Sequence, residues 1–344
     1  MGFIDADAHV DETEETWTYV LPSEERYRPV LLDPPGVGGF KAGQGNHHKL
    51  LVTAGNTRLQ RYHGHSGTTD ESRELRDVPA RLRHMDELGV EVQVIYPSAL
   101  LYPTQPRPEV ETTVYGAYNR WLADKTSGTG GRLRWAYIPP VLSMDRAVAE
   151  LEWAKENGAC AVFKKGVEYD RAASHPYFYP LYAEAERLDL PICFHTSPHT
   201  YVSDIGETVP FLHLTPISAF MSLAGDGVPQ IFPRLRWGFI EAGVSWVPYA
   251  LKEIRRTAKQ ERDFDSTFVK ANRFYVAADT EDELPPLVDR YGGADWLMMA
   301  TDYGHLLREL PAHQVVVDRA QRDEIPPDVV DRIVSGNARE LYAL

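Results

Sequence analysis

Apolar and polar positions alternate along this chain with two different periods. Residues 78–88 carry apolar side chains at helical spacing and stop at Gly89, and residues 90–96 then alternate at every second position, as strands do. The same helix-then-strand unit recurs toward the C-terminus. The pattern predicts eight strands: the N-terminal run from Phe3 and residues 90–96, 134–138, 159–164, 191–195, 236–241, 273–277 and 296–302. Further helices are predicted at 145–156, 180–188, 245–262, 281–291 and 328–341.

Short apolar strands that alternate with amphipathic helices indicate parallel pairing through crossover connections. Eight such units predict an α/β fold, a (β/α)8 TIM barrel formed by a single domain over residues 1–344. An open doubly wound sheet is the alternative, but no strand is followed by a Gly-x-Gly-x-x-Gly turn. A long excursion at 11–72 follows the first strand, and it is either a lid or binding loop or a disordered insertion.

Composition narrows the possible partners. The net charge of -14 argues against a nucleic-acid or anionic-membrane partner, because both need a broad basic surface. Cys160 and Cys193 lie in apolar runs and form no disulfide framework, which fits a reducing compartment. The N-terminus has no signal-peptide pattern, and no apolar segment reaches membrane-spanning length. A cytoplasmic enzyme is therefore expected, and a homodimer is a candidate assembly because barrels often pair.

Candidate chemistry begins in the first strand. Asp7 and His9 are two residues apart and share one face of that strand, and Glu12 follows just beyond its end. The carboxyl ends of all strands meet at one mouth of a barrel, so the later strands should bring His195, Glu241 and Asp302 to the same place. Clustered carboxylates repel one another unless a cation or protons neutralise them. The sequence therefore predicts a metal site.

Five ordered motifs carry a family resemblance, and they are Ile4-Asp5-Ala6-Asp7-Ala8-His9, Met85-Asp86-Glu87-Leu88-Gly89-Val90, Phe194-His195-Thr196, Glu241-Ala242-Gly243-Val244-Ser245-Trp246-Val247-Pro248 and Thr301-Asp302-Tyr303-Gly304-His305. With them, nearly the whole chain resembles the amidohydrolase-related family, which includes aminocarboxymuconate-semialdehyde decarboxylase and resorcylate decarboxylases. The resemblance implies a metal-bearing barrel. The residues that coordinate the metal directly would be Asp7, His9, His195 and Asp302.

Two departures from that family pattern favour a different chemistry. Decarboxylases and hydrolases of the family usually carry a histidine where this chain has Glu241, and Glu12 is an additional carboxylate. The full candidate set has four carboxylates and two histidines, the inventory of carboxylate-bridged di-iron sites: Asp7, His9, Glu12, His195, Glu241 and Asp302. In that set the chain resembles the nonheme diiron monooxygenase branch of the family, typified by the diterpenoid hydroxylase of platensimycin and platencin biosynthesis.

Resemblance to that branch implies two Fe ions and molecular oxygen as co-substrate, with Glu241, Asp302 and His195 at the reacting centre. It also implies an external electron donor and a hydrophobic small-molecule substrate, with an acyl-CoA such as a diterpenoid acyl-CoA among the candidates. Lys164, Lys165 and Arg171 would then be candidate contacts for the substrate's phosphates. His199 and His305 lie next to ligand motifs. Each is a candidate for a hydrogen-bond donor to a metal ligand, an additional ligand or a proton relay.

Three alternatives stay open at the level of sequence. The first is a mononuclear Mn- or Zn-dependent decarboxylase or hydrolase in which Glu241 is the acid or base. The second is a binuclear hydrolase that uses a carboxylated Lys164 or Lys165, although such enzymes typically begin with His-x-His and not Asp-x-His. The third is a non-catalytic binding protein on a decayed barrel.

Overall fold

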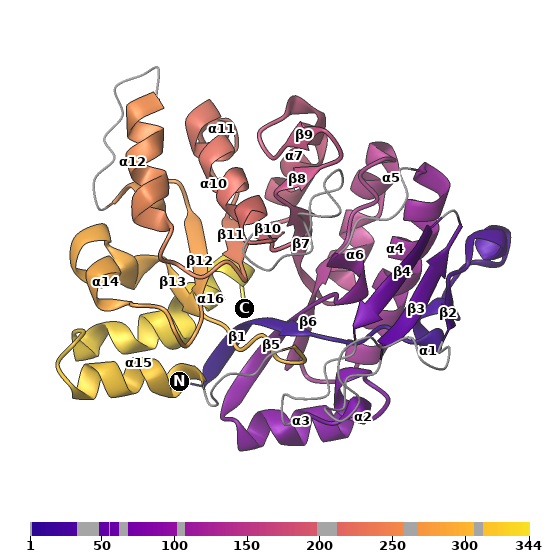
Figure 1. Cartoon of the computed structure of the whole chain (residues 1–344), viewed down its shortest axis with the longest axis horizontal. Helices are drawn as coiled ribbons and strands as arrows, with labels where there is room; N and C mark the ends of the chain where they lie inside the picture. The colour runs from indigo at the N-terminus through magenta and orange to yellow at the C-terminus, as the bar shows by residue number, and fades with distance from the viewer. Residues whose placement is uncertain are drawn as a thin grey trace.

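Eight parallel strands form the centre of the computed structural model, which describes residues 2–32, 48–54, 56–61, 68–101, 107–197, 212–257, 267–305 and 312–344. Neighbouring strands pair in the order β1 (Phe3–His9), β5 (Val90–Tyr96), β6 (Leu133–Tyr137), β7 (Ala159–Lys165), β10 (Ile192–His195), β11 (Trp237–Ile240), β12 (Phe274–Ala278) and β13 (Leu297–Met299). Helices surround this sheet on the outside (Figure 1). The predicted (β/α)8 barrel is confirmed.

The barrel closes between its first and last strands. Ala8 forms a parallel bridge with Tyr303, the amide of His9 donates to the Tyr303 carbonyl at 2.6 Å, and the amide of Asp302 donates to the Asp7 carbonyl at 3.1 Å. An open doubly wound sheet would leave these strands at opposite edges. Closure therefore rules out that alternative and brings the ends of β1 and β13 together.

Helices follow or separate the barrel strands as crossover connections require. The structure places them at α3 (Val78–Glu87), α4 (Pro108–Thr126), α5 (Met144–Ala149), α6 (Leu151–Glu156), α7 (Tyr179–Arg187), α10 (Leu214–Asp226), α11 (Val228–Ile231), α12 (Val247–Thr257), α13 (Phe268–Ala271), α14 (Pro285–Tyr291), α15 (Ala312–Gln321) and α16 (Asn337–Tyr342). Short 3-10 turns lie at η2 (Ala99–Leu101), η3 (Pro176–Phe178), η4 (Gly293–Asp295) and η5 (Pro327–Val329), and a π-helical turn, η6 (Arg332–Gly336), leads into α16.

Local chemistry explains where these helices begin and end. The Asp77 carboxylate accepts from the Ala80 amide at 2.9 Å and caps α3, which ends before Gly89 at a φ of 68°. The helix predicted at 281–291 begins only at Pro285, because proline suits a first helical turn and the preceding residues form a loop. The helix predicted at 145–156 is two short helices, α5 and α6, joined at Glu150.

The described parts of the excursion after β1 contain their own elements. They are α1 (Glu14–Trp17), η1 (Pro22–Tyr27), the antiparallel strands β2 (Val30–Leu32), β3 (His48–Thr53) and β4 (Asn56–Arg61), and α2 (Asp70–Arg73). The small sheet lies beside α1 and α4 at one side of the barrel (Figure 1). A two-stranded ribbon, β8 (Val167–Glu168) with β9 (Arg171–Ala172), follows β7. A lid role for the excursion remains a prediction.

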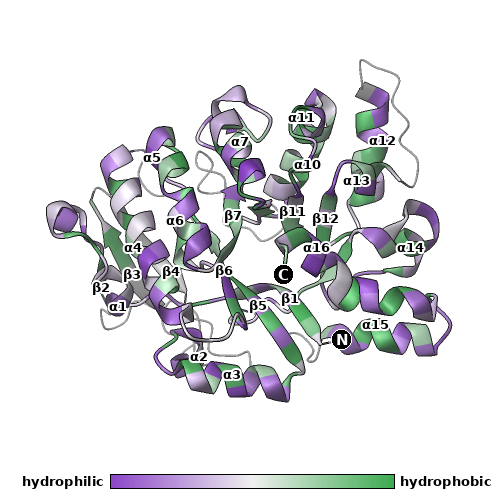
Figure 2. Cartoon of the chain, turned by 180° about the vertical axis from the view of Figure 1, so that it is seen from behind, coloured by the Kyte–Doolittle hydropathy of each residue, from purple (hydrophilic) through white to green (hydrophobic). Residues whose placement is uncertain are grey.

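Burial of the strands explains their composition. Every residue of β1, β7 and β11 is buried, as expected when helices cover the outer face of a parallel barrel and side chains fill its interior. Figure 2 shows mostly hydrophobic colour on the strands, interrupted by hydrophilic bands on β1 and β5, and mixed colour on the outer helices. None of the helices in the described ranges combines the length and apolar character that crossing a membrane requires.

Gly166, directly after β7, allows a very close backbone approach. A Cβ added there would lie 1.7 Å from the Thr215 carbonyl oxygen at the start of α10. Gly166→Ala should therefore lower the free energy of unfolding by about 3 kcal/mol, measured by urea denaturation. Gly225→Ala in α10 is the control, because its Cβ would meet no atom within 4 Å and alanine favours a helix. Equal stability of the two variants would contradict this packing.

Candidate metal centre

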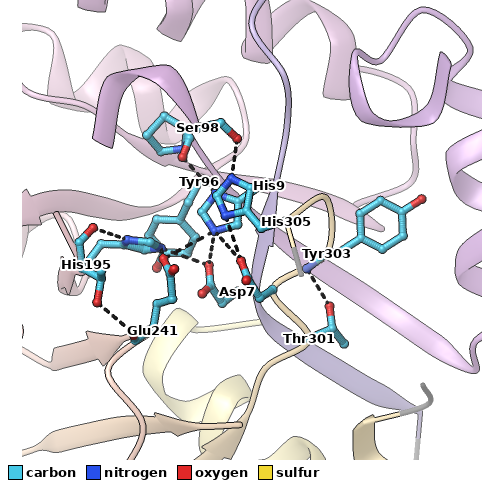
Figure 3. Close-up of polar contacts among 12 residues, drawn as sticks. Asp7, His9, Tyr96, Ser98, His195, Glu241, Thr301, Tyr303 and His305 are labelled. Carbon is cyan, nitrogen blue, oxygen red and sulfur yellow. Dashed lines mark hydrogen bonds and ion pairs between the residues drawn. The ribbon is translucent and has the colours of Figure 1, made fainter. Parts of the chain in front are cut away.

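The ends of four barrel strands converge on one point at the carboxyl mouth of the barrel (Figure 3). Asp7 and His9 come from β1, and His195 is the last residue of β10. Glu241 follows β11 directly, and Asp302 lies three residues beyond the end of β13. The His9 Nε2 atom lies 3.3 Å from Asp7 Oδ1 and 3.2 Å from Asp302 Oδ1. The His195 Nε2 atom lies 3.2 Å from both Asp7 Oδ1 and Glu241 Oε2. Strand-end reasoning thus predicted residues that the structure brings together.

Backbone carbonyls orient both imidazoles toward the centre. His9 Nδ1 lies 2.9 Å from the Pro97 carbonyl oxygen, and His195 Nδ1 lies 2.9 Å from the Thr196 carbonyl oxygen. A carbonyl only accepts, so each Nδ1 carries the proton and each Nε2 presents a lone pair when the ring is neutral. Metal-binding histidines use the same arrangement to fix ring orientation and tautomer.

Three buried polar atoms at this point make no hydrogen bond of proper geometry, and they are Asp7 Oδ2, His9 Nε2 and Glu241 Oε2. The His9 and Glu241 atoms have ion-pair neighbours instead, the nearest being Asp302 Oδ1 and His195 Nε2, each at 3.2 Å. Leaving such atoms unsatisfied is costly, and most buried polar atoms in proteins are paired. Asp7, His9, His195 and Glu241 each offer a ligand atom, and these atoms lie within 4.8 Å of one another. The donor set therefore fits a cation.

Electrostatics point in the same direction. Burial would raise the pKa of Asp7, but the His195 and His9 rings outweigh it and lower that pKa to about 2. Burial and the negative charge of Asp302 raise the pKa of Glu241 well above its usual range. Burial lowers the pKa of His9, but the adjacent Asp7 and Asp302 carboxylates outweigh it and raise that pKa well above its usual range. The cluster thus holds protons where a cation would supply the same positive charge.

Two of the converging carboxylates stand on strained backbone. Glu241 has a φ of 58° and Asp302 a φ of 53°, in the left-handed region that residues other than glycine seldom adopt. Each such residue costs on the order of 1 to 3 kcal/mol and persists only where the surrounding structure enforces it. The side chains of these two are also the accessible ones, at 24% and 26% relative exposure, whereas that of His9 is at 0%. The centre therefore opens toward solvent on the side of Glu241 and Asp302.

A buried hydrogen-bond network behind the centre fixes β1 against its neighbours. The Asp5 carboxylate accepts from the amide and hydroxyl of Thr301, at 2.9 and 2.6 Å, and from Gln93 at 3.0 Å. Arg81 continues the network by donating to Gln93 at 2.8 Å and to the His9 carbonyl at 3.1 Å. Burial raises the pKa of Asp5 to about 7. Asp5 therefore has a structural role, and sequence alone does not single out its partners.

His305 joins the centre from the loop after β13. Its Nδ1 lies 3.0 Å from Asp302 Oδ1, its Nε2 lies 2.7 Å from the Ser98 hydroxyl, and its ring stacks on His9 with centroids 3.7 Å apart. One atom each from His9, Glu241, Asp302 and His305 forms a second group within 4.8 Å. Sequence alone does not point to Ser98, although it stands two residues beyond the end of β5.

Glu12 belongs to neither group of ligand atoms in the described residues. Its two carboxylate oxygens accept from the backbone amides of Ser98 and Ala99, at 3.1 and 2.9 Å. Those bonds fix the loop after β5, and the same loop presents the Ser98 hydroxyl to His305. Its position supports a structural role for Glu12, whereas the sequence suggested a metal ligand.

The lysines and the arginine predicted to contact substrate phosphates lie at and just after the end of β7. Lys164 and Lys165 are both buried, and Lys164 pairs with Glu168. Arg171 pairs with Asp170 at 3.2 Å and lies over the Tyr177 ring. His199 lies outside the described residues. None of these positions tests a phosphate contact, which remains a prediction.

A family model described as amidohydrolase matches residues 4–344, nearly the whole chain. The chain belongs to the amidohydrolase family. The predicted family resemblance is thereby confirmed, and a metal-dependent enzyme is the coarse function that follows. The match does not test the resemblance to the diiron monooxygenase branch.

Solved structures share this fold over most of their length. An amidohydrolase, map2389c from Mycobacterium avium subsp. paratuberculosis K-10, has a TM-score of 0.78 at 19% identity and covers 99% of both chains. The 4-oxalomesaconate hydratase of Rhodopseudomonas palustris has a TM-score of 0.65 at 17% identity, over 99% of this chain and 95% of its own. A 5-carboxyvanillate decarboxylase from Novosphingobium aromaticivorans DSM 12444, complexed with manganese, has a TM-score of 0.61 at 16% identity, over 77% and 80%. At these identities the likeness shows the fold alone.

Metal binding should stabilise the protein measurably. A ligand that binds only the folded state adds about 4 kcal/mol when present at roughly 1,000 times its dissociation constant. We expect Mn²⁺ or Zn²⁺ to raise the melting temperature of chelator-stripped protein, and a chelator to reverse the increase. A melting temperature that millimolar Mn²⁺ and Zn²⁺ both leave unchanged would contradict a metal centre here.

Glu12 should make stability depend on pH. Burial raises its pKa in the folded protein from about 4.5 to about 7, because the protonated form is favoured there. Its contribution to stability is complete below about pH 4.5 and is lost as the pH rises through about 7. The difference in unfolding free energy between the wild type and Glu12→Gln should therefore fall across that interval. A difference that is constant with pH would show that Glu12 has the same pKa in the folded and the unfolded protein, and would contradict this prediction.

Proposed function

We propose that this protein is a metal-dependent decarboxylase or hydrolase of small organic acids that uses one divalent cation. Asp7, His9, His195 and Asp302 would hold the cation, and Glu241 would transfer a proton. The observation that carries the proposal is the convergence of Asp7, His9, His195 and Glu241, whose ligand atoms lie within 4.8 Å of one another, with Asp302 Oδ1 3.2 Å from His9 Nε2. The position of Glu12 on two backbone amides weighs against the four-carboxylate di-iron set.

The donor atoms favour particular metals. Two carboxylates with two imidazoles suit Mn²⁺ or Zn²⁺, and the oxygen share favours the harder Mn²⁺. Support comes from the Novosphingobium decarboxylase of the same fold, which is complexed with manganese. When bound, the cation would polarise a substrate oxygen or lower the pKa of a water molecule.

Glu241 is suited to proton transfer because of its place and its environment. Its carboxyl group lies 3.2 Å from His195 Nε2 and opens to the barrel mouth, so a substrate can reach it. Burial and the negative charge of Asp302 raise its pKa, which favours the protonated form that a general acid needs. In decarboxylation that proton would pass to the carbon that carries the carboxylate, the carbon–carbon bond would break, and carbon dioxide would leave. In hydrolysis the ionised form would instead take a proton from water.

Aromatic side chains line the barrel interior below the centre. The rings of Tyr96 and Phe163 lie 5.0 and 6.0 Å from the His195 ring, centroid to centroid, and both residues are buried. An apolar interior excludes water from the inner side of the ligands and strengthens the electrostatic interactions among them. Substrate would therefore approach from the mouth, where Glu241 and Asp302 are accessible.

A binuclear oxygenase is the second candidate, and His305 is the observation that favours it. His305 adds a third imidazole, and its group of ligand atoms shares His9 and Glu241 with the group around Asp7. Two Fe ions would balance these carboxylates more fully than one divalent ion. Such an enzyme would use molecular oxygen and an external electron donor to hydroxylate a hydrophobic substrate, with CoA-linked acyl groups among the candidates. Two metals per chain and oxygen-dependent turnover would favour it over the proposed decarboxylase or hydrolase.

Two variants separate metal binding from proton transfer. His195→Ala should lose bound metal, whereas Glu241→Gln should keep close to one metal per chain and lose turnover by roughly 100-fold or more. Elemental analysis measures the metal, and anaerobic assays on a panel of aromatic acids, with detection of carbon dioxide, measure turnover. His175→Ala is the control, because His175 is exposed at the start of η3.

The same assays can refute the proposal. Full metal content in His195→Ala would remove that residue from the ligand set. Undiminished turnover in Glu241→Gln would remove Glu241 from proton transfer. Turnover that stops without oxygen would exclude decarboxylation and hydrolysis as the main activity.

A further inference from the structure

Strand β7 ends in two consecutive lysines that face opposite sides of the barrel wall. Successive side chains of a strand alternate between its faces. Lys164 points outward: it is fully buried, paired with Glu168, and its Nζ lies 3.4 Å from the centroid of the Phe178 ring before α7. Its charge is therefore balanced within the outer layer.

Lys165 shares the inner face with the candidate metal centre. It pairs in register with His195 on β10, and paired residues of parallel strands point to the same side. Phe163, two positions earlier on the same face, has its ring 6.0 Å from the His195 ring. Adjacent strands lie about 4.8 Å apart, so Lys165 starts one strand away from a metal ligand.

Two polar side chains of α4, Tyr115 and Glu111, lie on the side of the helix near the Lys165 amine. The Lys165 Nζ lies 3.4 Å from the Tyr115 hydroxyl, and Glu111 stands one helical turn earlier on the same helix face. Glu111 accepts from the Leu142 amide at 2.7 Å and from the Tyr169 hydroxyl at 2.9 Å. Tyr169 has a φ of 57°, so strained backbone also occurs here.

The charge of the centre shows what Lys165 can contribute. Three carboxylates, Asp7, Glu241 and Asp302, with one divalent cation leave one negative charge. Such a centre has no excess positive charge with which to attract a second anionic group. A cation one strand away would supply it, because charges in a partly buried site are weakly screened.

We propose that Lys165 forms an anion subsite that receives a second anionic group of the substrate, while a first carboxylate meets the metal centre. The inference rests on the proposed function and deepens it, since it assigns the substrate to small organic acids with two anionic groups. Tyr115, 3.4 Å from the Lys165 amine, would position that amine. Lys164 has no such role, because its amine lies outside the barrel wall.

Binding of two simple acids tests the inference without knowledge of the natural substrate. Isophthalate has two carboxylates and benzoate has one, and calorimetric titration into Mn²⁺-loaded protein gives the ratio of their affinities. A hydrogen bond to a charged group corresponds to roughly 10- to 100-fold in affinity, so the wild type should prefer isophthalate by about that factor. Lys165→Met should remove the preference and Lys165→Arg should keep it.

Matched variants exclude a purely structural role. Lys164→Met should lower the melting temperature, because it leaves Glu168 buried without its partner, but should keep the preference for isophthalate. If Lys165 served only to balance Glu111, Lys165→Met would lose stability and keep the preference, and the inference would be wrong. Lys165→Gln provides the same measurement should the methionine variant not fold.

Failure of the inference and failure of the proposed function are distinguishable. A wild type that holds Mn²⁺ and binds both acids equally overturns the anion subsite and leaves the metal centre intact. A wild type that holds no metal overturns both, and elemental analysis of the same sample reports it.

Discussion

Three carboxylates and two imidazoles meet at one largely buried point, and compensation of their charge is the constraint on which the structure depends. Two like charges 4 Å apart repel by about 4 kcal/mol at the effective dielectric constant typical of protein sites. Asp7, Glu241 and Asp302 all lie within 4 Å of His9 Nε2. A divalent cation held by these side chains would supply the compensating positive charge.

The barrel holds this repulsive arrangement in place through bonds outside the centre. Backbone carbonyls fix the two imidazoles, and Asp5 ties β1 to Thr301 and to β5. Glu241 and Asp302 adopt left-handed backbone that only such a rigid surrounding maintains. Strain and accessibility coincide at these two residues, so the centre is open to solvent at the barrel mouth.

Sequence was sufficient for the barrel and for most of the centre. Buried parallel strands give continuous apolar runs, and residues that end such strands must meet at one mouth, which is why His195 and Glu241 could be predicted to lie together. Alternation along β7 also distinguishes Lys164 from Lys165, although the pair reads at first as one basic patch. Local pattern thus carries information wherever a strand fixes the direction of a side chain.

Loops carry no such information. Glu12 lies only three residues after His9 in sequence. Its carboxylate nevertheless accepts hydrogen bonds from the amides of Ser98 and Ala99, more than 80 positions away. His305 reaches Asp302 because Gly304 adopts a φ of 102° beside the His9 carbonyl, where a Cβ would lie 3.2 Å from its oxygen. Both outcomes depend on tertiary contacts of residues that no periodic pattern constrains.

Anomalous scattering from crystals of the metal-loaded protein distinguishes one cation from two, because it counts and identifies the ions together. A single-cation centre predicts one peak at the absorption edge of manganese or zinc, within coordination distance of Asp7, His9, His195 and Asp302. Two iron peaks, the second beside His305, would contradict the single-cation centre and support the binuclear oxygenase. Absence of any peak at these side chains would contradict a metal centre altogether.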